Sequence, residues 1–189
     1  MRATRGGFQV LLIAATAATL GCGPAAEPAP VADQPMAAAV DSMSPREAAR
    51  DIIATARFAT LVTIGPDGHP QARVVDPFAP DSAFVVRVAT NAVSRKVSEI
   101  AADPRVTLLY FDVAGNSYVT LIGTAELVRD DAERARWWKE DWATFYQDRN
   151  MGDDYMLIRI RPTRLEISSE RHGISNDAVT WRPMLVPMP

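Results

Sequence analysis

The chain has 189 residues, of which 23% are charged and 48% hydrophobic, and its 20 Lys and Arg against 23 Asp and Glu give a formal net charge of −3. This ordinary globular composition argues against a wholly disordered, fibrous or polytopic membrane protein, and the negative balance offers no basic surface for nucleic acid. One cysteine and two histidines exclude an internal disulfide and a cysteine-built zinc site and leave little for a histidine cluster, so we expect no metal site.

The first 21 residues have the pattern of a secretory signal peptide. Arg2 and Arg5 form a short basic region, and residues 8–20 follow without a charge, in mostly small and apolar side chains. That uncharged stretch is shorter than the roughly 20 residues that span a bilayer, and it fits the apolar region of a cleaved signal. We therefore expect residues 1–21 to be a signal peptide and no part of the fold.

Cys22 follows this segment directly, in the sequence Ala-Thr-Leu-Gly-Cys. The sequence resembles the bacterial lipobox, with the small residue Gly21 before the cysteine and Thr19 at the third position before it. The resemblance implies that Cys22 is lipidated and becomes the new N-terminus. A lipid anchor would hold the protein in the bacterial cell envelope, outside the cytoplasm, in the periplasm or at the outer membrane. The alternative is a lone buried cysteine after an uncleaved anchor.

Residues 22–43 are rich in Ala, Pro and Met, a composition typical of a tether that its prolines partly extend. The folded domain is expected over residues 44–189. A helix opens it, because Ser44 can cap, Pro45 suits the first turn and Glu47 can complete a capping box. Apolar residues then recur at helical spacing as far as Ala56.

Apolar and β-branched runs separated by turn residues predict six strands, and two further segments have helical spacing. The strands are expected over 58–64, 71–75, 83–89, 105–112, 118–128 and 155–167, the last interrupted near Pro162, and the helices over 94–102 and 130–146. Short connections imply antiparallel pairing. We expect a mostly β fold, a closed or split barrel with peripheral helices, with the proline-containing tail 180–189 lying along a neighbouring surface.

Residues 88–97 carry the most informative candidate site. Thr90, Asn91, Ser94, Arg95 and Lys96 fall between an expected strand and an expected helix. The unpaired N–H groups of a helix N-terminus, two hydroxyls and two full positive charges together suit a phosphate monoester. The alternative is that Ser94 only caps the helix and that the two basic side chains lie on its solvated surface.

Arg73 is the second candidate, because it interrupts an apolar strand. If its side chain points inward it needs a partner, and it could join Arg95 and Lys96 on one anion. The alternative is an outward-facing residue on an alternating strand.

Taken together, these segments resemble the flavin-binding split-barrel family of pyridoxamine-phosphate oxidases, most of all its general-stress-protein branch. The matching segments follow in order and spacing at residues 60–63, 68–75, 89–91, 94–96, 103–111 and 123–126. The resemblance covers roughly residues 45–170. It implies a six-stranded antiparallel split β-barrel that pairs as a homodimer.

The resemblance also implies that flavin mononucleotide (FMN) lies at the dimer interface, with site residues that the family pattern assigns. The FMN phosphate would be held by Arg73, Ser94, Arg95 and Lys96, and the isoalloxazine edge would lie near the backbone of Val74, Val75, Thr90 and Asn91. A deazaflavin or a heme could occupy the same groove in related branches.

Two departures from the oxidase pattern argue against vitamin B6 oxidation. The segment Asp76-Pro77-Phe78 lacks the lysine that follows the strand arginine in true oxidases, and Arg171 and His172 are adjacent where the family separates them. No residue pair stands out as acid and base. We expect an FMN-dependent oxidoreductase-like protein acting on an unidentified small redox substrate; the alternative is a non-enzymatic lipoprotein that binds or senses flavin, deazaflavin or a tetrapyrrole.

The remaining aromatic, histidine and acidic residues have simpler interpretations. Trp137, Trp138 and Trp142 at helical spacing predict core or interface, with stacking on a flavin or substrate as the alternative. His69 is expected to be solvated in a turn, and His172 to lie in a loop. The acidic pairs at 130–131 and 153–154 are expected to start a helix and form a turn rather than to bind metal.

Overall fold

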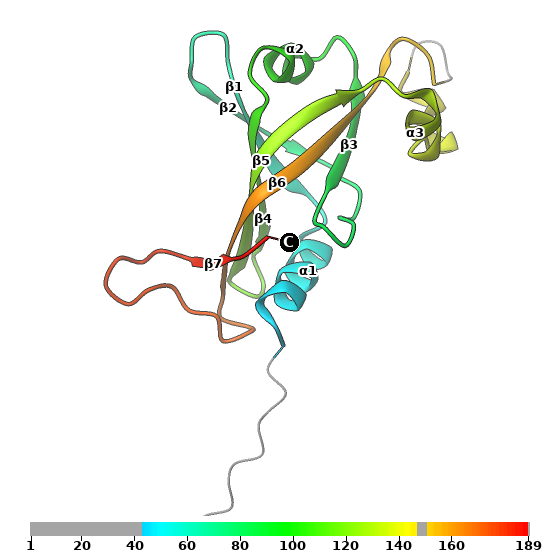
Figure 1. Ribbon diagram of the computed structural model, residues 1–189. Coiled ribbons are helices and arrows are strands. Elements are labelled where there is room, and N and C mark those ends of the chain that lie inside the picture. The colour runs from blue at the N-terminus through cyan, green and yellow to red at the C-terminus, as the bar shows by residue number, and fades with distance from the viewer. Residues whose placement is uncertain (1–42, 147–150, 189) are drawn as a thin grey trace, which may run out of the picture. The chain divides into compact units, whose positions relative to one another are not determined.

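The computed structural model describes residues 43–146 and 151–188 (Figure 1). The predicted signal peptide, Cys22 and almost all of the predicted tether therefore lie outside the described residues. The elements are α1 (Pro45–Ala56), β1 (Ala59–Ile64), β2 (Pro70–Val75), β3 (Val86–Asn91), α2 (Arg95–Ala102), β4 (Arg105–Asp112), β5 (Ser117–Val128), α3 (Asp131–Arg136), a 3-10 helix η1 (Glu140–Thr144), β6 (Tyr155–Ser169) and β7 (Met184–Val186). Within the described ranges, no helix combines the length and apolarity that a membrane span requires.

Helix α1 begins with the predicted capping box. The Glu47 N–H donates to Ser44 Oγ at 3.3 Å, and the Ser44 N–H donates to Glu47 Oε2 at 2.9 Å. Two otherwise unpaired N–H groups are thus satisfied at the helix start. The apolar face of α1 is buried against the sheet through residues that include Ile52 and Ile53.

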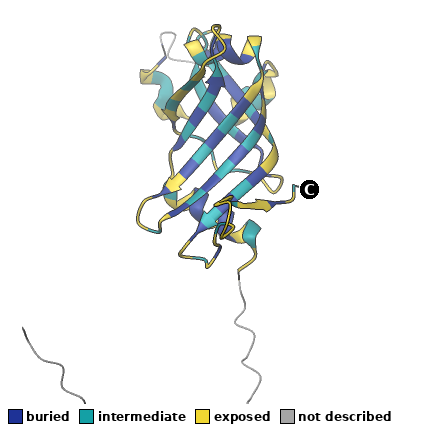
Figure 2. Cartoon of the chain, turned by 90° about the vertical axis from the view of Figure 1, so that its left-hand side faces the viewer, coloured by how far each residue is buried: buried dark blue, intermediate teal, exposed yellow. Residues whose placement is uncertain are grey.

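The strands form one antiparallel sheet in the order β2-β1-β4-β5-β6-β3, with the short β7 added on β6. Buried residues alternate with half-buried or exposed ones along the strands (Figure 2), as expected for a curved sheet with one face on the core. The inward face supplies the largest fully buried side chains, among them Leu61, Leu108, Tyr110, Leu121, Ile160 and Leu165. β2 and β3 are the two end strands, and the sheet does not close between them. The predicted mostly β split barrel is confirmed.

Strand β3 begins later than expected, at Val86 rather than at residue 83. The Asp81 carboxylate accepts hydrogen bonds from the N–H groups of Ala83 and Val85, both at 3.0 Å, and Phe84 has a φ of 60°. This turn buries Phe84 without making it part of the ladder. The apolar run therefore predicted burial correctly but not the strand start.

The single helix expected over residues 130–146 is wrong. The chain forms α3, then an extended residue at Lys139 (φ −119°, ψ 130°), then η1. The break lets Trp138 and Trp142 pack against Tyr155 from β6, with ring centroids 5.2 and 6.4 Å away. Aromatic packing, and not helical periodicity, decides the path of this segment.

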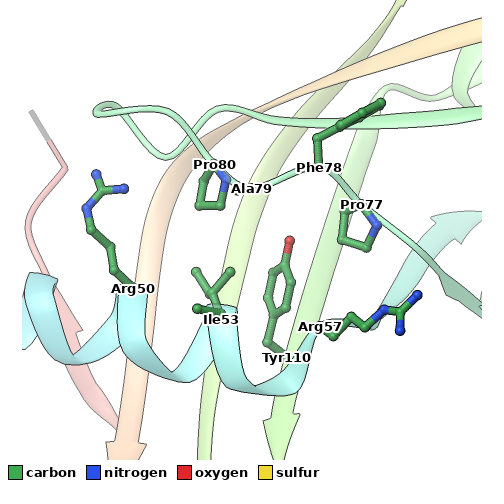
Figure 3. A pocket seen from close by; sticks show the side chains of 9 residues that line it. Arg50, Ile53, Arg57, Pro77, Phe78, Ala79, Pro80 and Tyr110 are labelled. Carbon is green, nitrogen blue, oxygen red and sulfur yellow. The ribbon is translucent and has the colours of Figure 1, made fainter. Parts of the chain in front are cut away.

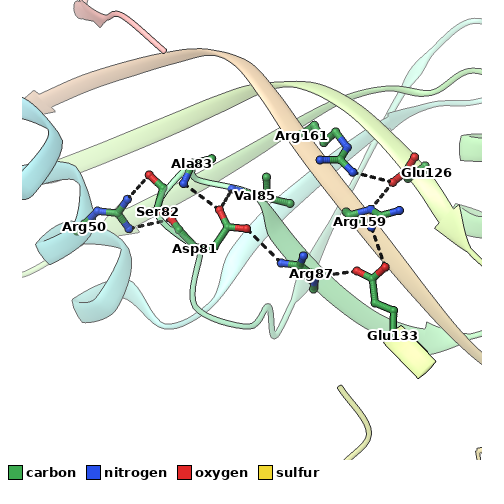
Figure 4. A network of polar contacts seen from close by, with 10 residues as sticks. All are labelled: Arg50, Asp81, Ser82, Ala83, Val85, Arg87, Glu126, Glu133, Arg159 and Arg161. Atoms are coloured by element: carbon green, nitrogen blue, oxygen red, sulfur yellow. Dashed lines mark hydrogen bonds and ion pairs between the residues drawn. The ribbon is translucent and has the colours of Figure 1, made fainter. Parts of the chain in front are cut away.

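A chain of ion pairs holds α3 against β3 and β6 (Figure 4). Arg87 Nε lies 3.1 Å from Glu133 Oε1, and Arg159 Nη1 lies 2.7 Å from Glu133 Oε2. Arg159 also pairs with Glu126, and Arg87 lies 3.5 Å from Asp81. These contacts explain how α3, which buries none of its own residues, keeps its place.

Strand β6 runs on through Pro162, where an interruption was expected. The β5–β6 register shifts between Ile122 and Gly123, and Gly123 lies opposite Pro162. A Cβ at Gly123 would collide with the Arg161 carbonyl oxygen, so the bulge requires glycine here. The tail does lie along a neighbouring surface, because β7 pairs with residues 165–167 of β6.

Candidate functional site

A pocket of about 320 Å³ lies between the end strands β2 and β3. We call it the β2–β3 pocket, and its lining residues are Arg73, Val74, Val75, Asp76, Ala89, Thr90, Lys96, Trp142, Phe145 and Tyr146. Five of the eight residues expected to bind the cofactor line it, namely Arg73, Val74, Val75, Thr90 and Lys96. The curved sheet brings these residues together because β2 and β3, the first and last strands in its order, lie on either side of the gap where the sheet does not close.

Lys96 and Thr90 line this pocket, and the hydroxyl of Ser94 lies next to them. Lys96 Nζ donates to Thr90 Oγ1 at 2.7 Å, and Thr90 Oγ1 lies 3.3 Å from Ser94 Oγ. Burial lowers the pKa of Lys96, the nearby charge of Arg73 lowers it further, and Glu99 opposes the shift. A half-buried ammonium beside a second cation is a favourable place for an anion.

Arg73 points inward, so the outward-facing alternative is excluded. Its guanidinium donates to Glu99 Oε2 at 2.6 Å and also to the hydroxyl of Thr63, and its side chain is 18% exposed. Thr63 and Glu99, which accept these bonds, are both buried. Arg73 is thereby oriented at the pocket wall by two contacts that the sequence reading did not foresee.

Glu99 on α2 is the residue that sequence reasoning missed. Its side chain is 1% exposed, accepts from Thr63 Oγ1 at 2.5 Å, and lies 3.0 Å from Arg95 Nε. Burial raises its pKa, but hydrogen bonds from Thr63 and Arg73 and the charges of Arg73 and Arg95 outweigh that effect, so the pKa lies below its ordinary value. The available signal was its position four residues after Arg95 on the buried face of α2.

The other three predicted residues border the pocket without lining it. Ser94 makes no side-chain capping bond to α2, and its hydroxyl faces Thr90. Arg95 has a side chain 67% exposed and pairs with Glu99. Asn91 Oδ1 accepts from the Val93 N–H at 2.9 Å and so closes a turn. The cluster of Arg73, Arg95, Lys96 and Glu99 has three cations and one carboxylate, which leaves a net charge of +2.

Aromatic residues form the opposite wall. Trp142, Phe145 and Tyr146 line the pocket, whereas Trp137 and Trp138 pack into the second core cluster around Tyr155. Phe145 is 77% exposed. The core interpretation thus holds for Trp137 and Trp138, and Trp142 contributes both to that cluster and to the pocket.

Comparison with known proteins identifies the family to which this arrangement belongs. A model of the pyridoxamine 5'-phosphate oxidase family matches residues 45–169. The chain belongs to the pyridoxamine 5'-phosphate oxidase family. The matched region contains both end strands, α2 and the whole cationic cluster.

Individual members of the family are similar to this chain over part of its length or at low sequence identity. A pyridoxine/pyridoxamine 5'-phosphate oxidase of Cupriavidus pinatubonensis is 40% identical over 76 residues, which are 40% of this chain and 35% of that protein's length. General stress protein 26 of Bacillus anthracis has a TM-score of 0.55 at 21% identity, over 74% of this chain and 98% of that one. A pyridoxamine 5'-phosphate oxidase-related, FMN binding protein of Nostoc punctiforme has a TM-score of 0.57 at 16% identity, over 69% and 86%. These two structures establish the split-barrel fold.

The adjacent residues Arg171 and His172 of this chain make their contacts away from the β2–β3 pocket. His172 Nδ1 lies 2.7 Å from Ser169 Oγ, and its Nε2 lies 3.1 Å from Asp51 Oδ2. Arg171 pairs with Asp51 at 2.7 Å and with Asp112 at 3.2 Å. Arg171 and His172 therefore tie the end of β6 to α1 and do not line the β2–β3 pocket.

The remaining sequence expectations concern exposed or capping groups. His69 is exposed in its turn, where its N–H donates to Asp67 Oδ1 at 3.1 Å. Asp130 caps α3 by accepting from the Glu133 N–H at 2.7 Å. In the part of the chain that the structure describes, no group of three His, Cys, Asp or Glu side chains could hold a metal ion.

Proposed function

We propose that the chain binds FMN in the β2–β3 pocket and acts as an FMN-dependent oxidoreductase on a small redox substrate. The convergence of Arg73, Lys96 and Thr90 in one pocket beside the N-terminus of α2 carries this proposal. Membership of the pyridoxamine 5'-phosphate oxidase family and the FMN-binding neighbour support the choice of flavin.

The residues present fit a flavin phosphate. A phosphate monoester needs several donors and positive charge, which two cations, two hydroxyls and the first-turn N–H groups of α2 supply. Ser94 leaves those N–H groups without a side-chain cap. Glu99 holds Arg73 in place and reduces the local charge to a value that matches a dianion.

The ring end of the cofactor would meet the free edges of the sheet. Among the described strands, β2 pairs with β1 and β3 with β6, so one edge of each end strand has no ladder partner there. On that edge of β3 the Arg87 carbonyl accepts a hydrogen bond from the Phe78 N–H at 2.9 Å. Val74, Val75, Thr90 and Asn91 lie on these strands. When bound, the flavin supplies hydride or electron transfer, and the protein supplies placement and electrostatics.

A homodimer would complete the site. A pocket of about 320 Å³ is near the lower end of the range for small-molecule sites, and Val74 beside Arg73 is 71% exposed. Members of the family are commonly dimeric. We expect Val74→Asp both to dissociate the dimer, as measured by sedimentation, and to weaken FMN binding.

Pyridoxamine phosphate is not the substrate that this chain favours. Arg171 and His172 are held by Asp51 and Ser169, and the segment Asp76-Pro77-Phe78 lacks the lysine of the oxidase pattern. These departures favour the alternative function, a non-enzymatic protein that binds flavin or deazaflavin. For heme, the described lining of the pocket offers no His, Cys or Met as an axial ligand, which leaves Tyr146 as the side chain of a type that can ligate heme iron.

The cofactor test is a visible absorption spectrum of the full chain after incubation with FMN and removal of free cofactor. A retained flavin spectrum that a reductant bleaches is the expected result. Arg73→Gln and Lys96→Gln should each weaken FMN binding about tenfold or more, because each removes a charge-assisted hydrogen bond. Arg95→Gln should weaken FMN binding less, and the exposed control Arg182→Gln should leave FMN binding unchanged. A wild type that stays colourless after this incubation would overturn the FMN assignment.

We further propose that Cys22 is lipidated and anchors the protein in the cell envelope, outside the cytoplasm, in the periplasm or at the outer membrane. The lipobox-like sequence before Cys22 supports this. Mass spectrometry of the mature N-terminus should find an acylated cysteine, and Cys22→Ser should release the protein from membranes. An unmodified, uncleaved N-terminus would refute the anchor.

A further inference from the structure

A second pocket, of about 290 Å³, lies between α1 and the segment 77–80 (Figure 3). We call it the α1 pocket. Its walls are mainly apolar, and it shares no lining residue with the β2–β3 pocket; it is lined by Arg50, Ile53, Ala54, Arg57, Pro77, Phe78, Ala79, Pro80 and Tyr110. Nothing in the proposed flavin chemistry uses this place.

Tyr110 gives the pocket an unsatisfied polar group. The residue is 0% exposed, its hydroxyl has no hydrogen-bond partner, and in Figure 3 it points from β4 toward the segment 77–80. A buried hydroxyl without a partner is unusual in a folded protein. Burial raises the pKa of Tyr110, so the group stays a neutral donor. A ligand acceptor oxygen would satisfy it.

Arg50 of α1 and Arg57, which directly follows that helix, make the surroundings electropositive. Arg50 donates to the carbonyl oxygens of Asp81 and Ser82 at 3.1 and 2.9 Å, which fixes it at one side of the pocket. Arg57 is held less firmly: within the described residues it has one ion pair, with Asp76, which is 3.8 Å long between side chains 70% and 56% exposed. Its guanidinium also lies 4.8 Å from the centroid of the Phe58 ring. Such an exposed, long pair holds a guanidinium weakly, so Arg57 is available to an incoming anion.

We propose that the α1 pocket binds a compact apolar carboxylate. The carboxylate would accept hydrogen bonds from Arg57 and from the Tyr110 hydroxyl, since its two oxygens offer about four lone-pair positions. The apolar body would pack on Ile53, Ala54 and Pro77. Because Tyr110 is fully buried, the segment 77–80 must shift to admit the ligand. The small volume limits the ligand to about the size of an aromatic or short aliphatic acid.

The test is calorimetric titration of the full chain with benzoate, with benzyl alcohol as the uncharged analogue of matched size. Benzoate should bind and raise the Tm of unfolding, and benzyl alcohol should bind at least tenfold more weakly. Tyr110→Phe and Arg57→Gln should each weaken benzoate binding about tenfold. The matched control Arg182→Gln, on an exposed arginine outside this pocket, should leave it unchanged.

Several outcomes would overturn the proposal. Benzoate that gives neither heat nor a change in Tm would do so, and so would equal binding by wild type, Tyr110→Phe and Arg57→Gln. If Arg57→Gln instead changed the sedimentation of the protein while benzoate did not bind, the pocket would be a contact between two copies of the chain. None of these results depends on whether FMN binds.

Discussion

Glu99 Oε2 on α2 lies 2.6 Å from Arg73 Nη2 on β2, and the carboxylate side chain is 1% exposed. This ion pair joins a helix to an end strand beside the β2–β3 pocket. Buried ion pairs contribute little net stability relative to apolar residues, but removing one partner leaves an uncompensated charge. The pair therefore orients Arg73 and makes each member dependent on the other.

Glu99→Gln should lower the free energy of unfolding by about 3 kcal/mol, because Arg73, only 18% exposed, would lose its charged partner. Urea denaturation measures the effect. Asp103→Asn is the matched control, since Asp103 also pairs with an arginine, Arg105, at 2.6 Å, but that arginine is 74% exposed. Its effect should be much smaller. Equal losses in the two variants would show that burial does not strengthen the Glu99 pair.

The same carboxylate predicts how stability changes with pH. The pKa of Glu99 in the folded protein lies below the ordinary value of 4.5. A lowered folded-state pKa contributes stability that is fully present above the ordinary pKa and is lost as the pH falls through the folded-state pKa. The free energy of unfolding of the wild type should therefore fall below pH 4.5 more steeply than that of Glu99→Gln.

Other carboxylates titrate in the same range, so only the difference between the two proteins reports on Glu99. Hydrogen bonds from Arg105 lower the pKa of Asp103 to about 2, and this group remains in both proteins. Parallel pH curves for wild type and Glu99→Gln would contradict the assignment of a lowered pKa to Glu99.

Gly123→Ala should destabilise the fold, because the new Cβ would collide with the Arg161 carbonyl across the β5–β6 bulge. Backbone on the facing strand cannot move aside as a flexible side chain could, so we expect a loss of about 1 to 3 kcal/mol in unfolding free energy. Thermal denaturation checks this, with Thr124→Ser at the exposed neighbouring position as control. An unchanged Tm would mean that the bulge can relax.

Tyr110→Phe should stabilise the ligand-free protein. The substitution removes a buried hydroxyl that has no partner and keeps the ring that packs in the core, so about 1 kcal/mol of desolvation cost is avoided. Chemical denaturation without added acids measures it. A destabilised variant would indicate that the hydroxyl makes a hydrogen bond through water.

Features that depend on neighbouring residues were predicted well. The capping box of α1 and the full extent of β4 came from patterns only a few residues long, because capping and strand alternation are local physics. The start of β3, expected at residue 83, was wrong because the turn at Asp81 outweighs local periodicity there. The single helix expected over 130–146 was also wrong, because aromatic packing on Tyr155 breaks it.

The candidate site divides in the same way. The sequence alone determined that Ser94, Arg95 and Lys96 start a helix after a strand and that Arg73 is a cation in an apolar strand. Only the tertiary structure decided that Arg73 faces Glu99, that Lys96 and not Arg95 lines the pocket, and that Tyr110 is buried without a partner. Side-chain burial and pairing depend on residues distant in the chain, which come together only when the sheet curves and leaves β2 and β3 apart.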